Sequence, residues 1–277
     1  MNKNKTPICL SIAGLDPSGG AGIIADIKTF TAFRCYAASA VTSLTFQNTT
    51  GVFGVVNQSA ESVRGQVQPV LDDFEVSALK TGMLPTKDVI EEIAQIVKKN
   101  KLKNFVVDPV VRSTSGFDLI DDNALKSLIN QLFPLSEIVT PNIPEAERIT
   151  GMKIENEQDF EKSARIIQSF GAKNVLIKGG HFQAEKTKNI ENSAKDYLFI
   201  GDELVIFEGE YYETTSTHGT GCTLAAAITA NLALGKTLTE AVRIAKMFVN
   251  EAIRTSPNIG HGHSPINHLL FDFGIKH

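Results

Sequence analysis

The chain has 277 residues, enough for one large α/β domain or two small ones. Its 42% apolar and 21% charged residues and its net charge of −4 are typical of a soluble globular protein, and they argue against nucleic acid or an anionic membrane as a partner. No apolar run approaches the ~18 residues that a membrane span needs. Three widely separated cysteines without a Cys-x-x-Cys motif predict a reducing, cytoplasmic location rather than a disulfide framework or a zinc site.

The first third of the chain predicts a strand, a glycine-rich loop and a helix in succession. Residues 8–13 have the pattern of a short buried strand, 14–20 that of a turn-rich loop, and 21–33 repeat apolar residues at helical spacing. Such a βα unit favours a parallel sheet. A strand over 41–46 that ends in a polar loop, and a helix over 59–71, follow.

The rest of the chain continues to alternate between strands and helices. The patterns predict strands over 76–79, 104–107, 137–139 and 174–177, and helices over 86–100, 123–133, a short stretch ending at 150, 157–170, 220–234 and 238–254. Segments 197–200 and 204–207 flank a Gly-Asp-Glu turn and predict an antiparallel edge hairpin. The expected fold is a doubly wound, mostly parallel sheet with helices on both faces, and residues 1–277 are expected to form a single domain because no linker or repeat interrupts them.

The segment 216–223, Ser-Thr-His-Gly-Thr-Gly-Cys-Thr, precedes the strongest helical pattern. Helix starts carry unpaired N–H groups and partial positive charge, and Gly219 and Gly221 allow close backbone approach, so an anion is the expected ligand. The pKa of a Cys222 thiol in the first turn can be lowered there. The alternative is a glycine-containing loop before a core helix with a small buried cysteine. A Walker loop and a dinucleotide fingerprint are both absent from the sequence.

Several polar residues come directly after predicted strands, where ligands of open α/β sheets bind. Asp108 and Glu145, together with an anion-binding loop, suggest Mg²⁺ held largely through water. The alternatives are a turn residue before Pro109 for Asp108 and a helix-start carboxylate for Glu145. Lys178 can reach a polyphosphate or face solvent. The remaining strand-end residues are Gln47, Lys80 and Asn142, and His218 of the glycine loop could touch phosphate or shape that loop.

The Gly-Thr-Gly-Cys segment resembles the anion-hole loop of the ribokinase-like kinases, and Cys222 in place of the usual Asp resembles their vitamin-kinase branch. Within it, the hydroxymethylpyrimidine/phosphomethylpyrimidine kinases of thiamine biosynthesis are the most similar group. The resemblance runs from about residue 8 to 269 and is carried by Gly14-Leu-Asp-Pro-Ser-Gly-Gly-Ala-Gly22 with Asp26 downstream, Gln47-Asn-Thr, Lys80-Thr-Gly-Met83-Leu, Val107-Asp-Pro-Val110, Asn-x-x-Glu at 142–145 and the tail 260–268.

The resemblance implies ATP-dependent phosphorylation of 4-amino-5-hydroxymethyl-2-methylpyrimidine and then of its monophosphate, with Mg²⁺ as cofactor. It implies that the amide of Gln47 reads the aminopyrimidine edge, since an amide offers one donor and one acceptor. The other implied substrate contacts are Met83, Val110, Gly14, Ala21 and Asp26. The implied phosphate, nucleotide and metal groups are the N–H groups of Gly219, Thr220, Gly221 and Cys222, with Cys222 also as base, Lys178, Asn142, His218, Asp108 and Glu145.

Two other functions stay open at this point. A pyridoxal kinase is the nearest alternative, and a catalytically silent vitamin-binding protein is an alternative of another class. Arg112, where many relatives have a small or apolar residue, could meet a phosphorylated substrate or face solvent. A homodimer is expected because it is common among similar kinases.

Overall fold

The computed structural model describes residues 5–111, 119–180 and 193–269. Arg112 therefore lies outside the described residues. The strands within these ranges are β1 (Ile8–Leu15), β2 (Tyr36–Asn48), β3 (Gly51–Asn57), β4 (Ala78–Thr81), β5 (Phe105–Val107), β6 (Ile138–Val139), β7 (Asn174–Lys178), β8 (Ser193–Ile200) and β9 (Glu203–Glu210). All of them join one sheet in the order β3-β2-β1-β4-β5-β6-β7-β8-β9.

The six strands from β2 to β7 in this sheet run parallel, and β8 and β9 extend it as an antiparallel hairpin. The predicted fold class is confirmed. Strand β3, antiparallel to β2 at the other edge, was not predicted, because 47–51 read as a polar loop. The two glycines of Gly51–Asn57 obscure its strand pattern, and Gly54 leaves room for the ring of Phe46, which a Cβ would approach to 2.6 Å.

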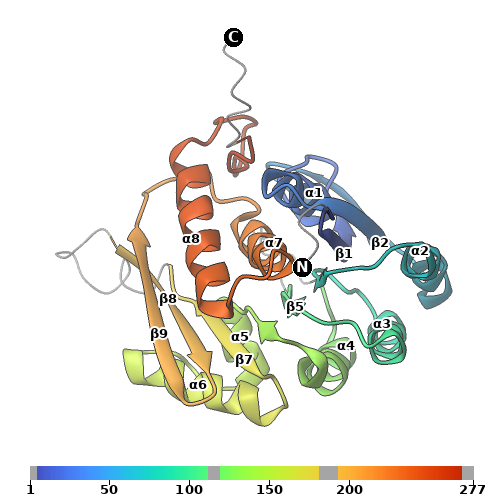
Figure 1. Ribbon diagram of the computed structural model, residues 1–277. Coiled ribbons are helices and arrows are strands. Elements are labelled where there is room, and N and C mark those ends of the chain that lie inside the picture. Colours follow the sequence, from blue (N-terminus) through green and yellow to red (C-terminus); the bar gives the residue numbers. More distant parts are fainter. Residues whose placement is uncertain (1–4, 112–118, 181–192, 270–277) are drawn as a thin grey trace.

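Eight α-helices are described, and they cover both faces of the sheet. They are α1 (Gly22–Ala32), α2 (Ala60–Asp73), α3 (Lys87–Asn100), α4 (Asp122–Ser127), α5 (Ile143–Thr150), α6 (Glu157–Ser169), α7 (Thr220–Ala233) and α8 (Leu238–Arg254). Helices α1, α7 and α8 pack on one face and α2 to α6 on the other (Figure 1). With helices on both faces of the central strands, the ends of these strands are open to ligands.

The helix predicted over 123–133 is shorter and irregular. After α4, the chain forms a π-helical turn, η1 (Leu128–Leu132), and a 3₁₀ turn, η2 (Phe133–Leu135). Pro134 lacks the N–H group that a continuing α-helix needs, which accounts for the stop. The prediction was right about the helical character of the segment and wrong about its regularity.

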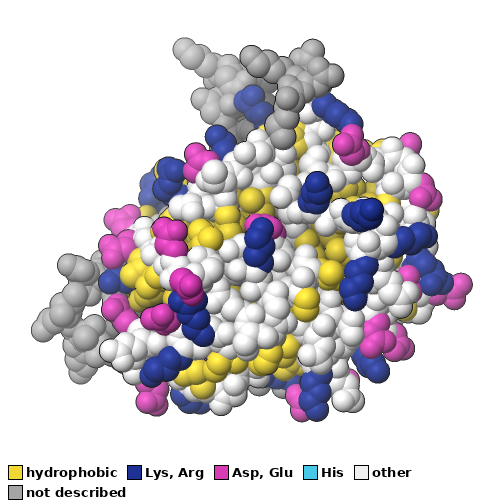
Figure 2. All heavy atoms as spheres, turned by 60° about the horizontal axis from the view of Figure 1, so that its bottom comes forward, with side chains coloured by type: hydrophobic (Ala, Val, Ile, Leu, Met, Phe, Trp, Pro, Cys, Tyr) yellow, Lys and Arg dark blue, Asp and Glu magenta, His cyan; other side chains and the backbone are white. Residues whose placement is uncertain are grey.

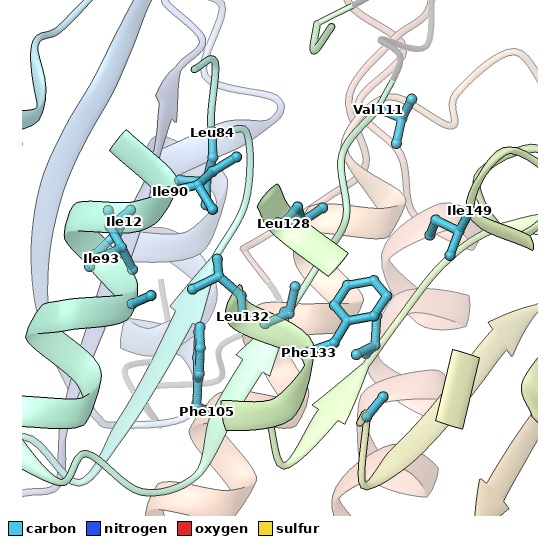
Figure 3. Close-up of a cluster of buried hydrophobic side chains, with 14 of the residues drawn as sticks. Ile12, Leu84, Ile90, Ile93, Phe105, Val111, Leu128, Leu132, Phe133 and Ile149 are labelled. Atoms are coloured by element: carbon cyan, nitrogen blue, oxygen red, sulfur yellow. The ribbon is translucent and has the colours of Figure 1, made fainter. Parts of the chain in front are cut away.

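The larger core lies between the sheet and the α2 to α6 layer. Figure 3 shows Ile12 and Phe105 of the sheet beside Ile93 of α3 and Leu132 and Phe133 of the irregular turns. Helix α3 supplies six buried apolar residues at helical spacing, and the hydroxyl of Thr86 caps its start. This packing makes the sheet a rigid base for the loops at its carboxyl end.

The C-terminal segment joins two distant parts of that end. His263 donates its backbone N–H to the Thr49 carbonyl (2.8 Å) in the β2–β3 turn, and His218 donates its own to the Ser264 carbonyl (3.3 Å). Further along, His268 Nε2 lies 2.9 Å from Thr223 Oγ1 in the first turn of α7. The tail thereby holds the β2–β3 turn against the segment that begins α7.

The face of the molecule shown in Figure 2 has no large patch of positive charge of the kind that binds a polyanion. Lysine and arginine side chains are interspersed with aspartate and glutamate on the face shown in Figure 2. Among the described helices, none combines the length and apolarity required to cross a bilayer.

Candidate active site

One cavity of about 970 Å³ opens at the carboxyl ends of β1, β4, β5 and β7 and is closed on one side by the start of α7. The strand order reverses direction at β1, which β2 and β4 flank, and such switch points form the ligand crevice of doubly wound sheets. Predicted site residues from both halves of the chain line this cavity. They are Gly14, Ala21, Gln47, Met83, Asp108, Val110, Asn142, Glu145, Lys178, His218, Gly219, Thr220, Gly221 and Cys222.

The glycine loop before α7 is built around Gly219, the N-cap of that helix. Gly219 has φ 83°, and a Cβ on it would lie 1.8 Å from the Gly20 carbonyl oxygen, so only glycine fits. A Cβ on Gly221 would lie 3.2 Å from Lys178 Nζ. The first-turn N–H groups of α7 have no intrahelical acceptor, and the Lys178 ammonium lies beside them. Both kinds of donor therefore face the same part of the cavity.

The Cys222 thiol differs from the sequence-based expectation. Burial raises its pKa to about 11, and the ammonium of Lys80 offsets this only in part because the carboxylates of Asp108 and Asp26 act in the other direction. The prediction that the helix start lowers this pKa was wrong. Desolvation of the thiolate raises the Cys222 pKa by more than the start of α7 lowers it. The sulfur is therefore a protonated thiol at neutral pH.

Lys178 lies between two acidic side chains at the end of β7. Its Nζ is 3.1 Å from Asp108 Oδ1 and 3.9 Å from Glu145 Oε2. Glu145 also completes a capping box with Asn142 at the start of α5, which is the helix-start role that the sequence left open. Burial raises the Glu145 pKa to about 7, with Asp108 adding to the effect and Lys178 opposing it.

These acidic groups fit a magnesium ion of a particular kind. Among the described residues, no group of three or more His, Cys, Asp or Glu side chains could hold a metal by itself. Asp108 and Glu145 supply two buried carboxylates, and Mg²⁺ typically takes one or two carboxylates and fills its other positions with water and substrate phosphates. Burial, with Asp108 adding to it, raises the pKa of Glu145, and a bound cation would favour the ionised form of this carboxylate.

The apolar and amide groups predicted to bind a ring also line the cavity. Gly14 allows close packing of Met83, whose Sδ would be 3.0 Å from a Cβ at that position. Gln47 lies near the end of β2 and lines the same cavity as Cys222. The amide and the thiol therefore face the same cavity.

Two predicted residues have different surroundings from those expected. His218 was grouped with the phosphate-binding residues, but its Nε2 is 2.7 Å from Asp16 Oδ2 and 3.4 Å from Gln47 Nε2, so it belongs to the ring end. Asp26 was expected to contact substrate. It is fully buried, does not line the cavity, and accepts both hydrogen bonds of Lys80 Nζ at 2.9 Å.

Several site residues escaped the sequence reasoning. Asp16 is followed by Pro-Ser-Gly-Gly and accepts from the backbone N–H of Ser18 (2.8 Å), a turn signal that could have been noticed. Lys80 was noted at a strand end without a role, and it lines the cavity. The ion pair between Lys246 Nζ and Asp196 Oδ2 (2.7 Å) joins α8 to β8 at the cavity wall and has no local sequence signal.

A doubly wound sheet, a glycine-bounded helix start and a lysine paired with carboxylates at its strand ends define a ribokinase-like kinase. Comparison with known proteins narrows this class. The family model described as phosphomethylpyrimidine kinase matches residues 16–267. A hydroxymethylpyrimidine/phosphomethylpyrimidine kinase of Staphylococcus aureus is 43% identical over 268 residues, which cover 96% of this chain and 95% of that protein.

Two solved structures have the same fold. A phosphomethylpyrimidine kinase from Clostridium difficile is 42% identical with a TM-score of 0.77, covering 90% of this chain and 100% of that one. An ADP complex of Bacillus subtilis pyridoxal kinase is 36% identical with a TM-score of 0.85, covering 95% and 98%. This chain belongs to the phosphomethylpyrimidine kinase family.

The buried Lys80–Asp26 pair generates a stability prediction. Asp26→Asn leaves an uncompensated ammonium in a fully buried position and should lower the free energy of unfolding by about 3–5 kcal/mol. The double variant Asp26→Asn/Lys80→Met should recover a large part of that loss in urea unfolding. Glu251→Gln, which breaks the exposed pair with Arg254, is the matched control and should change little. Additive losses in the double variant would contradict the pairing.

Proposed function

We propose that this chain transfers a phosphoryl group from ATP to the hydroxymethyl group of 4-amino-5-hydroxymethyl-2-methylpyrimidine, and then phosphorylates the monophosphate to the diphosphate, in thiamine biosynthesis. The observation that carries the proposal is that Gln47 and Cys222 line one cavity with an anion-binding helix start. The names of the S. aureus and C. difficile relatives support it. Three free cysteines support a cytoplasmic location, which cell fractionation tests.

The pyrimidine ring binds between the amide of Gln47 and the apolar side chains of Met83 and Val110. Gly14 and Ala21 line the same end and leave room for a flat ring. A primary amide matches an exocyclic amino donor and the adjacent ring-nitrogen acceptor at once. In this position the hydroxymethyl group extends toward the loop before α7.

The backbone N–H groups from Gly219 to Cys222 stabilise the charge of the phosphoryl group in transit. Lys178 binds the ATP phosphates as a point charge, and Asn142 and the capped start of α5 lie beside it. Asp108 and Glu145 would hold Mg²⁺, largely through water, and the ion would neutralise charge on the phosphates. Catalysis then rests on positioning and electrostatics.

Cys222 contacts the substrate hydroxyl in this proposal. A thiol whose pKa is near 11 is mostly protonated at neutral pH, so its first role is to hold the hydroxyl by a hydrogen bond. Its thiolate form is a base for the hydroxyl proton. Phosphoryl transfer through a loose transition state makes modest demands on that base.

A coupled ADP-release assay tests the function directly. With Mg²⁺, turnover is expected on the aminopyrimidine alcohol and on its monophosphate, with less on pyridoxal. Chelation of the ion should lower the rate by about 100-fold or more because the phosphate charge is no longer neutralised. Faster turnover on pyridoxal would favour the alternative that the B. subtilis neighbour suggests. A silent vitamin-binding protein would turn over none of the three.

The role of Cys222 predicts a loss of rate rather than of binding. Cys222→Ala should lower kcat by about 100-fold or more, because acid–base assistance at one group is typically worth this much, with little change in pyrimidine affinity by calorimetry. Cys35→Ala, at a buried cysteine outside the cavity, is the control. Near-normal turnover by Cys222→Ala would remove the thiol from the mechanism.

The role of Gln47 predicts a change in selectivity. Gln47→Met removes the donor and acceptor that face the ring, and leaving polar groups unpaired costs about 1–3 kcal/mol. The variant should lose kcat/KM for the aminopyrimidine alcohol far more than for pyridoxal, which lacks the amino group. Equal losses on both substrates would show that the amide is not the selector.

We also propose that the chain forms a homodimer through the β2–β3 hairpin. Leu44, Phe46 and Val56 are 41%, 55% and 48% exposed there, and Leu44 pairs directly with Val56. Sedimentation should show a dimer for the wild type, a monomer for Phe46→Glu, and a dimer for Met247→Glu, a matched exposed apolar position on α8. A monomeric wild type would contradict this.

A further inference from the structure

The buried Lys80–Asp26 pair has its positive end at the cavity and its negative end inside the protein. Lys80 lines the cavity and Asp26 does not, although both side chains are 0% exposed. Both oxygens of Asp26 accept from Lys80 Nζ at 2.9 Å, and the Ser11 hydroxyl donates to Asp26 Oδ2 at 2.6 Å. The pair is therefore a fixed dipole with its cation toward the ligand.

Strand β4 directs this ammonium toward the start of α7. Ala78 of β4 belongs to the same apolar cluster as Ala226 of α7. Because side chains alternate along a strand, Lys80 lies on the same face of the sheet as Ala78. The charge of Lys80 lowers the pKa of the Cys222 thiol more than the charge of Asp26 raises it. The ammonium therefore lies closer to the Cys222 sulfur than its carboxylate partner does.

The Lys80 ammonium keeps its charge and has a hydrogen to spare. Burial acts to lower its pKa, but the charges of Asp26 and Asp108 outweigh burial and raise it. An ammonium has three N–H donors, and among the described residues its hydrogen-bond acceptors are the two oxygens of Asp26. Gly82, which lines the cavity, has no side chain to cover the ammonium, since a Cβ there would lie 3.1 Å from Nζ. A charged donor is therefore available beside the cavity.

The two phosphorylations proposed above place different charges beside Cys222, and the present inference rests on that proposed function. In the first step the acceptor is a neutral hydroxyl. In the second step it is a phosphate, which carries about −1.5 to −2 charges at neutral pH. Lys178 and Mg²⁺ balance the ATP phosphates in that arrangement, and the first-turn N–H groups of α7 stabilise the phosphoryl group in transit. The acceptor phosphate of the second step needs a further cation.

We propose that Lys80 is a specificity-determining residue that allows the monophosphate to act as the second substrate. Its ammonium balances the charge of the acceptor phosphate, and Asp26 fixes that ammonium on the cavity side of the pair. Opposite charges attract more strongly in a desolvated place than in water, so the pair distinguishes a charged acceptor from a neutral one. The alcohol brings no charge and gains little from Lys80.

The test is the ratio of kcat/KM for the monophosphate to kcat/KM for the alcohol, measured by ADP release. Asp26→Asn leaves the positive charge of Lys80 unbalanced, so the ratio should rise. The double variant Asp26→Asn/Lys80→Met has no unpaired charge, and its ratio should fall by about 10-fold or more because the phosphate loses its nearest cation. As a matched control, Lys246→Met/Asp196→Asn removes a second buried pair, both of whose members line the cavity, and should leave the ratio unchanged.

An unchanged ratio in Asp26→Asn/Lys80→Met would overturn the proposal, as would an equal fall in the control or a fall in Asp26→Asn. Should the Asp26 variants fail to fold, Gly82→Ala decides. Its φ lies outside the left-handed region, so alanine fits the backbone, and its methyl group would lie 3.1 Å from Lys80 Nζ. The ratio should fall in this variant, and an unchanged ratio there would overturn the proposal.

Failure of the proposed function gives a different result. A wild type that phosphorylates neither compound contradicts that function, and calorimetric affinities of the same proteins for the two compounds then decide the role of Lys80. A preference of the wild type for the monophosphate that Asp26→Asn/Lys80→Met loses would support the role, and equal affinities would overturn it. A wild type that phosphorylates the alcohol alone would overturn both the second step and this proposal.

Discussion

The contact on which the site depends is the backbone approach of two glycine loops. A Cβ at Gly219 would lie 1.8 Å from the Gly20 carbonyl oxygen, and a Cβ at Gly20 would lie 2.5 Å from Cδ2 of His218. Only glycines allow the loop after β1 to touch the loop before α7 at this distance. Because these loops are in contact, the proposed ring contacts, which come largely from the N-terminal half, and the start of α7 from the C-terminal half line one cavity. The tail reinforces the contact through Ser264 and the β2–β3 turn.

The charges around the cavity are arranged in advance, before any ligand binds. Lys80 pairs with Asp26, Lys178 with Asp108, and Lys246 with Asp196, at 2.7 to 3.1 Å. A carboxylate faces each lysine, and the fixed ammonium groups need no reorganisation when a phosphate arrives. The same carboxylates explain the high pKa of the Cys222 thiol, which lies among desolvated negative charge as well as beside Lys80.

Much of the architecture and part of the site could be predicted from the sequence. Strand-end residues such as Asp108 and Lys178 were predictable because parallel strands deliver the residues after them to one edge of the sheet. The pairing of His218 with Asp16 was not, since it joins positions 202 residues apart and depends on the loop contact at Gly219. Asp26 was predicted to contact substrate because nothing in the sequence around it shows that it is buried against Lys80. The Cys222 pKa was mispredicted because helix position is local whereas desolvation depends on the whole fold.

The most direct measurement is a crystal structure of this chain with the aminopyrimidine alcohol bound. The account predicts one ring in the cavity, with its amino group and adjacent ring nitrogen on the Gln47 amide and its hydroxyl within hydrogen-bond distance of the Cys222 sulfur. A ring bound apart from Gln47, or one whose hydroxyl lies away from the Cys222 sulfur, would contradict the claim that one cavity both selects the pyrimidine and presents its hydroxyl to the helix start.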